Sequence, residues 1–221
     1  MIPAFSIERT EEILYDLNDL INNGSIKNIP VYLDSPLAKN ILKVYKKYKN
    51  LFNDAALKKI NSGDDIFDFP NFNIVDDANE SLKVINDKSP KIVMAGSGML
   101  VGGRIVNYLP IFLTQKNNMV VFISFQAKNT NGEKLVKGHK TIYIDGKKVR
   151  VKCDIAQISA YSSHADKRKL KSFVKNIKHP EPNNIFINHG DVMQSLGFKH
   201  DLAKISRAKL TIPKPGKNYL I

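Results

Sequence analysis

The sequence predicts an α/β fold built on a parallel sheet, and two observations support this. Short apolar runs of strand length alternate with segments of helical spacing along the 221 residues. One such run, at 91–95, leads into a glycine-rich loop, a helical segment at 104–113 and another apolar run at 119–125. Strands that alternate with helices usually pair in parallel, because each helix returns the chain to the starting edge of the sheet.

The N-terminal elements follow this pattern. Residues 8–22 place five apolar side chains at helical spacing, and Gly24 follows as a helix stop. Residues 29–33 form an apolar strand that ends in Asp34-Ser35-Pro36, and helical spacing returns at 37–48. These segments predict a first β-α unit.

The C-terminal elements begin with a hairpin. Residues 141–144 and 148–152 flank Asp145-Gly146, a dipeptide that accepts the positive φ angles of a tight turn. The remaining sequence predicts strands and helices in alternation: strand 158–161, helix 166–177, strand 184–188, helix 192–206 and strand 209–212.

Composition limits the classes of function. Apolar runs are too short for a transmembrane helix or a signal peptide, which predicts a soluble protein without a membrane partner. The single cysteine, Cys153, excludes an internal disulfide framework and fits the cytoplasm. The net charge of +13 favours a polyanionic partner such as RNA, although an AT-rich coding sequence would also explain 29 Lys against five Arg.

The first candidate site is the glycine-rich loop between the strand at 91–95 and the following helix. Ser97 and the glycines Gly98, Gly102 and Gly103 allow the backbone to approach an anion, and Arg104 adds a donor fork for phosphate oxygens. The spacing matches neither a Walker A nor a dinucleotide fingerprint, so tight turns alone remain the alternative.

Two histidines follow strands in the C-terminal part. His164 lies in Tyr161-Ser162-Ser163-His164-Ala165-Asp166, and His189 follows the apolar run Ile185-Phe186-Ile187. Ligands of α/β proteins bind at the carboxyl ends of strands, so both histidines are candidates for one site. Each is equally compatible with a capping or surface role.

Several motifs together resemble a known family. The segment IPAFSIERTEE at 2–12, DSP at 34–36, the GSGM loop, YSSHAD and INHGD occur in the order found in the β-CASP branch of the metallo-β-lactamase superfamily. Its members are RNA-processing nucleases such as the cleavage and polyadenylation specificity factor endonuclease. The resemblance implies a Rossmann-like parallel sheet in a β-CASP domain at 1–157, and C-terminal strands and helices of a metallo-β-lactamase αββα fold at 158–221.

The resemblance also implies roles for individual residues. His164 would be catalytic, as a general acid or a holder of the scissile phosphate, and His189 would ligate one of two zinc ions. Arg9 and Ser163 join the loop residues as expected RNA or phosphate contacts. No HxHxDH motif occurs in the chain, so the N-terminal metal-binding half of such an enzyme is missing here.

The sequence therefore predicts the RNA-clamping and partial catalytic half of a zinc-dependent RNA nuclease. We expect the chain by itself to be inactive and to bind no zinc stably, with the missing half supplied in the same chain or by a separate one. A homodimer is compatible with the sequence. The alternatives are a non-catalytic RNA-binding module and, from the glycine loop alone, a nucleotide-binding or sugar-phosphate-binding domain.

Overall fold

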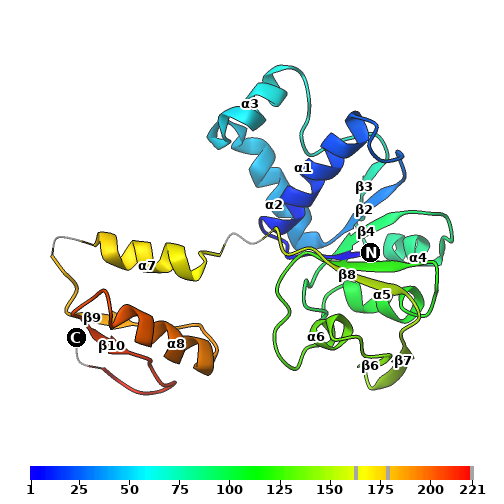
Figure 1. Ribbon diagram of the computed structural model, residues 1–221. Helices are drawn as coiled ribbons and strands as arrows, with labels where there is room; N and C mark the ends of the chain where they lie inside the picture. Colours follow the sequence, from blue (N-terminus) through cyan, green and yellow to red (C-terminus); the bar gives the residue numbers. More distant parts are fainter. Residues whose placement is uncertain (162–163, 178–179, 220–221) are drawn as a thin grey trace. The chain divides into compact units, whose positions relative to one another are not determined.

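The computed structural model describes residues 1–161, 164–177 and 180–219 and divides into two compact units (Figure 1). The N-terminal unit is Met1–Ser162 and the C-terminal unit is Ser163–Ile221. The predicted domain boundary, between residues 157 and 158, lies a few residues before this division.

Parallel strands form the centre of the N-terminal unit. A four-stranded sheet has the order β1-β4-β2-β3, and β5 pairs with β8. The Met1 nitrogen donates to the Met119 carbonyl (2.7 Å) and the Val121 N–H donates to the Met1 carbonyl (2.9 Å), which places β5 beside β1. The predicted α/β fold with a parallel sheet is confirmed. The strands are β1 (Ile2–Pro3), β2 (Val31–Asp34), β3 (Phe72–Ile74), β4 (Ile92–Ala95), β5 (Met119–Phe122) and β8 (Asp154–Gln157).

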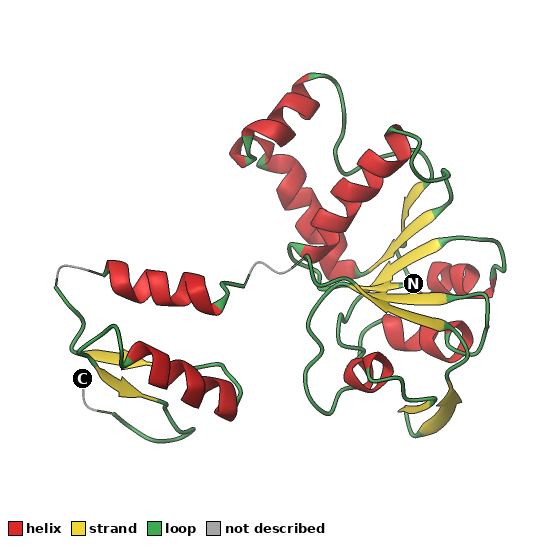
Figure 2. Ribbon diagram, viewed as in Figure 1, coloured by secondary structure: helices red, strands yellow, loops and turns green. Residues whose placement is uncertain are grey.

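Helices cover both faces of this sheet (Figure 2). One face carries α1 (Arg9–Asn22), α2 (Pro36–Lys47) and α3 (Asp54–Asn61), with a 3-10 turn at Lys49–Leu51. The other carries α4 (Ala78–Asn86), α5 (Ile105–Phe112) and α6 (Asn131–Val136).

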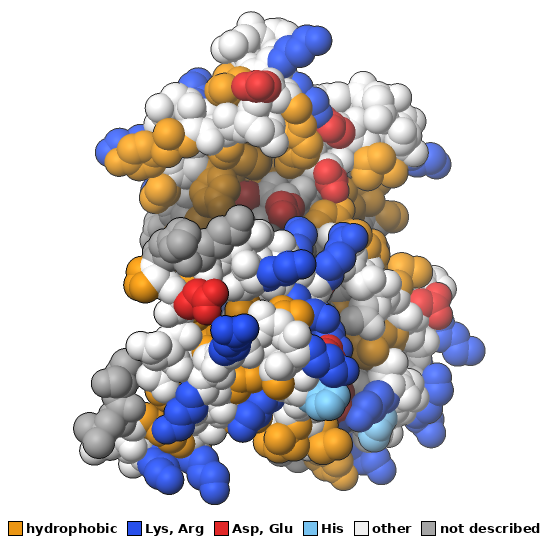
Figure 3. Space-filling view, turned by 60° about the vertical axis from the view of Figure 1, so that its left-hand side comes forward, with side chains coloured by type: hydrophobic (Ala, Val, Ile, Leu, Met, Phe, Trp, Pro, Cys, Tyr) orange, Lys and Arg blue, Asp and Glu red, His pale blue; other side chains and the backbone are white. Residues whose placement is uncertain are grey.

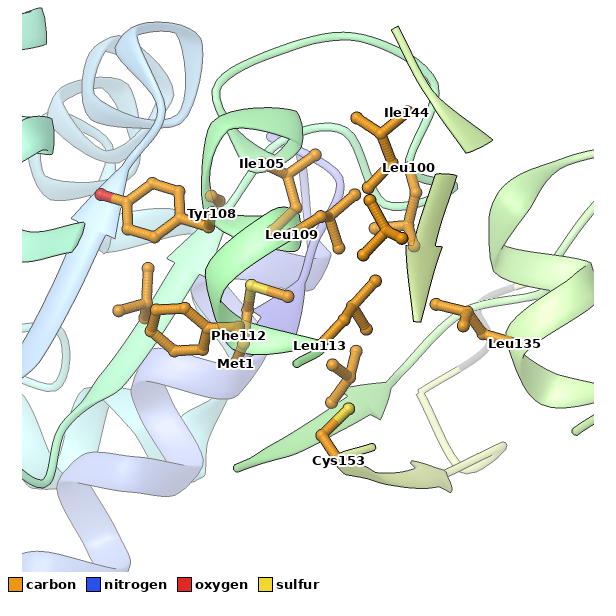
Figure 4. Packing of buried hydrophobic residues seen from close by; sticks show 14 of the residues in the cluster. Met1, Leu100, Ile105, Tyr108, Leu109, Phe112, Leu113, Leu135, Ile144 and Cys153 are labelled. Carbon is orange, nitrogen blue, oxygen red and sulfur yellow. The ribbon is translucent and has the colours of Figure 1, made fainter. Parts of the chain in front are cut away.

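Side chains that alternate along each strand contribute to two hydrophobic cores, one on each face of the sheet. In β4, Val93 and Ala95 pack with α4 and α5, whereas Met94 packs with α1 and α2. Figure 4 shows the first core, in which Leu109 of α5 and Leu113, the residue after this helix, pack with buried residues such as Leu100 and Cys153. A sheet buried on both faces explains why its strands are nearly continuous apolar runs in the sequence.

The predicted hairpin is confirmed. Strands β6 (Thr141–Ile144) and β7 (Lys147–Arg150) are antiparallel, and Asp145 and Gly146 have φ angles of 48° and 75°. The strand predicted at 158–161 is wrong. β8 occupies Asp154–Gln157 instead, because its register pairs these residues with Met119–Phe122 of β5.

The C-terminal unit is smaller and has little core. It contains α7 (Lys167–Asn176), β9 (Asn184–Phe186), α8 (Val192–Leu202) and β10 (Lys209–Thr211), with β9 and β10 parallel. Ile187 and Leu202 are its only fully buried apolar side chains among the described residues. No helix in the described part of the chain is long and apolar enough to cross a membrane.

Candidate nucleic-acid interface

The carboxyl ends of the parallel strands bring several sequence motifs to one edge of the N-terminal unit. β1 leads to Phe5 and Ser6, β2 ends in Asp34, β4 leads to the loop 96–104, and β5 leads to the segment 123–126. Ligands of α/β proteins bind at this edge. The glycine loop, the N-terminal IPAFS segment and the DSP motif therefore belong to one region.

The glycine loop is closed by its own hydrogen bonds. The Ile105 N–H donates to the Gly96 carbonyl (2.9 Å). The Ser97 hydroxyl donates to the Val101 carbonyl (3.0 Å) and accepts from the Val101 N–H (3.0 Å). Because the single hydroxyl hydrogen of Ser97 is donated to the Val101 carbonyl, a contact with a phosphate oxygen would require this hydrogen bond to be exchanged, and the predicted contact stays a prediction.

Two of the predicted loop residues have a backbone conformation that favours glycine. Gly102 and Gly103 have φ angles of 72° and 76°, in the left-handed region. A Cβ on Gly103 would also lie 2.5 Å from the Gly96 carbonyl oxygen. Gly98 lies against Phe5, whose ring would be 3.2 Å from an added Cβ. The glycines hold the loop close to its neighbours, and phosphate binding by them stays a prediction.

Arg104 points into the fold instead of out from the loop. Its Nη1 donates to Asp34 Oδ1 (2.8 Å), to the Ser81 hydroxyl (2.8 Å) and to the Asp77 carbonyl (2.7 Å). Asp34 is completely buried and also accepts from the Tyr108 hydroxyl (2.7 Å). Burial and the Asp34 carboxylate raise the pKa of Tyr108. This arrangement makes Arg104 the counter-ion of a buried carboxylate, and its predicted phosphate contact stays a prediction.

Asp34 is a functional residue to which the sequence pattern alone assigns no role, although it lies in the DSP motif. Ser35 begins α2, where its hydroxyl accepts from the Ala38 N–H (3.3 Å), and it also shares a hydrogen bond with Ser6 (3.1 Å). The DSP motif thus joins β1, β2 and the glycine loop. An acidic residue at the end of a strand, followed by Ser-Pro at the start of a helix, is the sequence pattern that could have indicated this linking role.

Arg9 also lies inside the N-terminal unit. Its side chain is 7% exposed and forms ion pairs with Glu8 and Glu12. The neighbouring Glu11 is buried, and no ion pair with a Lys or Arg side chain is found for its carboxylate among the described residues. Burial raises the pKa of Glu11 to about 7, with a smaller contribution from Glu8 and Glu12. The predicted RNA contact of Arg9 stays a prediction.

The two candidate histidines lie in the C-terminal unit, and both are exposed. His164 shortly precedes α7, whose first turn is capped by Asp166 accepting from the Lys169 N–H (2.7 Å). His189 has a φ angle of 61° and follows the buried Ile187, whose N–H donates to the Thr211 carbonyl (2.8 Å). Ser163 lies outside the described residues. The predicted cleft between the histidines and the glycine loop would join both units and stays a prediction.

The residues present do not by themselves fit a zinc centre. Among the described residues, no group of three or more His, Cys, Asp and Glu side chains could hold a metal ion. A zinc site needs three or four such ligands. Zinc ligation by His189 would therefore need ligands beyond the described residues, and it stays a prediction.

The excess of positive charge is larger in the C-terminal unit than in the N-terminal unit. It carries twelve Lys and Arg against four Asp and Glu, whereas the N-terminal unit carries 22 against 17. Lys and Arg also outnumber acidic side chains on the face in Figure 3. On α7, Arg168, Lys171 and Lys175 share one face by helical spacing. Such a surface is suited to a polyanion.

Comparison with known proteins decides the family. The Beta-Casp domain matches residues 10–135, more than half of the chain, and the Zn-dependent metallo-hydrolase RNA specificity domain matches residues 148–212. The chain belongs to the β-CASP family. The predicted resemblance to this branch of the metallo-β-lactamase superfamily is confirmed. The glycine loop falls in the β-CASP match, and both histidines fall in the RNA specificity match.

Relatives of this β-CASP chain include proteins of archaea and bacteria. It is 32% identical to the transcription termination factor FttA of Methanosarcina mazei over 86% of the chain and 31% of that protein. It is 30% identical to an RNase J-like protein of Methanocaldococcus jannaschii over 98% of the chain and 48% of that protein. A ribonuclease of Thermus thermophilus is 28% identical over 92% of the chain and 46% of its own length. The chain thus spans between a third and a half of these relatives.

Proposed function

We propose that this chain is the RNA-clamping half of a zinc-dependent RNA-processing nuclease and that a metal-binding half completes it. The observation that carries the proposal is the pair of family matches, to the Beta-Casp and RNA specificity domains, in sequence order along the chain. The net charge of +13 supports RNA as the partner. The first test is binding of single-stranded RNA, which should weaken steeply as salt rises.

Incomplete packing of the C-terminal unit supports a missing half that docks there. Among the described residues its sheet has two parallel strands, whereas parallel sheets usually have more strands and are buried on both faces. Val192, Met193 and Leu196 of α8 are at least half exposed. The longer relatives contain chain that could cover these side chains. We propose that the metal-binding half packs on this face of α8.

In the completed enzyme, His164 is proposed as the catalytic general acid or phosphate holder and His189 as one zinc ligand. His164 supports this role because it is exposed to solvent and lies in the YSSHAD motif of the family. We also propose a cytoplasmic location, where the single Cys153 would remain reduced.

Reconstitution with a metal-binding half from a longer relative tests both histidines. His164→Ala should leave zinc content unchanged and lower the cleavage rate by ~10²–10⁴, the usual contribution of a general acid or base. His189→Ala should lower zinc content, and excess zinc should partly restore activity. His139→Ala, a change of an exposed histidine in the N-terminal unit, is the control. Equal zinc content and equal rates in all three variants would contradict these roles.

A non-catalytic RNA-binding module is the second candidate. The lack of a metal-binding group among the described residues favours it. If reconstitution generates no RNase activity while RNA binding persists, this second function is the correct one.

A further inference from the structure

Phe125 is the most exposed aromatic side chain among the described residues. It is 71% exposed, whereas Ile123, two residues before it, is 1% exposed and Gln126, the residue after it, is 6% exposed. Burying a phenylalanine side chain is worth about 1.5–3 kcal/mol, so its exposure forgoes stability. An aromatic ring held outward beside a buried Gln126 points to a role outside the core.

The backbone that carries Phe125 is tied to the glycine loop. The Gln126 amide Nε2 donates to the Gly98 carbonyl (3.0 Å) and to the Ser124 carbonyl (3.2 Å). A Cβ on Gly132 would lie 1.7 Å from Gln126 Oε1, so only glycine at that position leaves room for the amide. Phe125 therefore has a fixed position relative to the loop that begins at Gly96.

Other exposed apolar side chains lie on the neighbouring loops. β1 lies between β4 and β5, and the three strands lead to Phe5, Val101 and Phe125 respectively. Phe5 is 37% exposed and contacts Gly98, and Val101 is 64% exposed. Adjacent strands are about 4.8 Å apart, which places the starts of the outer two loops about 10 Å apart. A ring, a glycine loop and a second ring therefore lie at one sheet edge.

This combination fits single-stranded RNA better than other ligands. Proteins that bind single strands combine cationic surface for the backbone with aromatic rings on which bases stack. A double helix hides the faces of its bases, and a free phosphate has no base to stack. We propose that Phe125 stacks on a nucleobase of single-stranded RNA whose backbone passes the glycine loop. This inference rests on the proposed function and names one contact within it.

Tryptophan fluorescence provides a direct test, because the chain contains no tryptophan. Phe125→Trp places a single indole at the proposed contact. An oligouridylate of roughly ten nucleotides, a usual site size for a single-strand binder, should quench its emission. An abasic ribose-phosphate oligomer of equal length should bind through charge and leave the emission unchanged.

Tyr48→Trp is the matched control. Tyr48 is 48% exposed at the end of α2, and α2 leaves the carboxyl edge of the sheet at Ser35, about 18 Å away at 1.5 Å per residue. Its emission should not respond to either oligomer.

Affinity provides a second measurement. Phe125→Ala should weaken oligouridylate binding about 5- to 150-fold, as expected for one stacked base, and should not change binding of the abasic oligomer. Phe125→Tyr should bind like the parent chain. These three results together would support stacking.

The negative outcomes are distinguishable. RNA binding with no response at position 125 and no loss in Phe125→Ala would overturn the stacking contact and leave the proposed function standing. If no variant bound RNA even at low salt, the proposed function would fail first. Quenching of the Trp at 125 by a metal-binding half without RNA would show a protein contact there and would overturn the inference.

Discussion

The two units of this protein use charged residues in opposite ways. In the N-terminal unit, some charged side chains pair with each other inside the fold, as Arg104 does with the buried Asp34. In the C-terminal unit, every buried side chain among the described residues is uncharged, and the basic residues of α7 face solvent. A basic residue near a predicted site can therefore serve to stabilise the fold. The unit with the larger excess of positive charge is the one expected to bind a polyanion.

The largest expected effect tests the internal role of Arg104. Arg104→Met would leave the buried Asp34 carboxylate without its cation and should lower the free energy of unfolding by about 3–5 kcal/mol. Urea denaturation measures this change. Arg150→Met, on the exposed strand β7, is the control and should change stability by less than about 0.5 kcal/mol.

If Arg104→Met weakened RNA binding strongly and left the free energy of unfolding unchanged, this assignment would be reversed. In that case Arg104 would contact phosphate, as the sequence predicts, and the contrast between the units would disappear.

Glu11 provides the next effect, through pH. Its folded pKa of about 7 lies above the usual 4.5, so between these values the unfolded chain has released a proton that the folded chain retains. Stability from this group is therefore lost as pH rises from about 4.5 to about 7. Glu11→Gln should raise the unfolding free energy above pH 7 by about 3 kcal/mol, at 1.36 kcal/mol per pKa unit. Thermal unfolding across this range measures it.

Glu12→Gln is the matched control for Glu11. Glu12 forms an ion pair with Arg9, so its neutralisation should not raise stability at any pH. An equal gain in both variants would show a general effect of acidic charge instead of the burial of one carboxyl.

The basic face of α7 tests the other half of the comparison. Changing Arg168, Lys171 and Lys175 to Gln should weaken single-stranded RNA binding about ten-fold and reduce the salt slope by about 2, since each phosphate contact contributes about 0.7. Filter binding at several salt concentrations measures both values.

The same number of cations on the N-terminal unit provides the control. Lys43, Lys49 and Lys58 are exposed. Changing these three residues to Gln should weaken RNA binding less than the changes on α7 do. Equal losses in both triple variants would mean that RNA binding follows the total charge alone.

The smallest expected effect concerns α8. Met193 is 79% exposed, so Met193→Asp should change the stability of the chain by less than about 0.5 kcal/mol. It should nevertheless prevent assembly with a metal-binding half, because the docked face would then bury a carboxylate. Leu51→Asp, at a 76% exposed position in the N-terminal unit, should assemble normally. Normal assembly of both would remove α8 from the interface.

Local patterns predicted much of the fold. Helical spacing placed α1, α2 and α5 within a residue or two, and Asp145-Gly146 identified the hairpin, because these signals depend only on neighbouring residues. Helices α3, α4 and α6 and strand β3 escaped prediction because they are short, between three and nine residues. Their stability comes mainly from packing against the sheet.

The family, the alternation of strands and helices, and the excess of positive charge follow from the amino-acid sequence alone. The tertiary structure was needed to show that Arg104 meets Asp34, 70 residues away, and that β8 begins at Asp154 by its register with β5. It was also needed to show that Phe125 projects outward while the next residue, Gln126, is buried. Pairing partners and exposure depend on which distant segments pack together, and a local pattern of residue types does not contain that information.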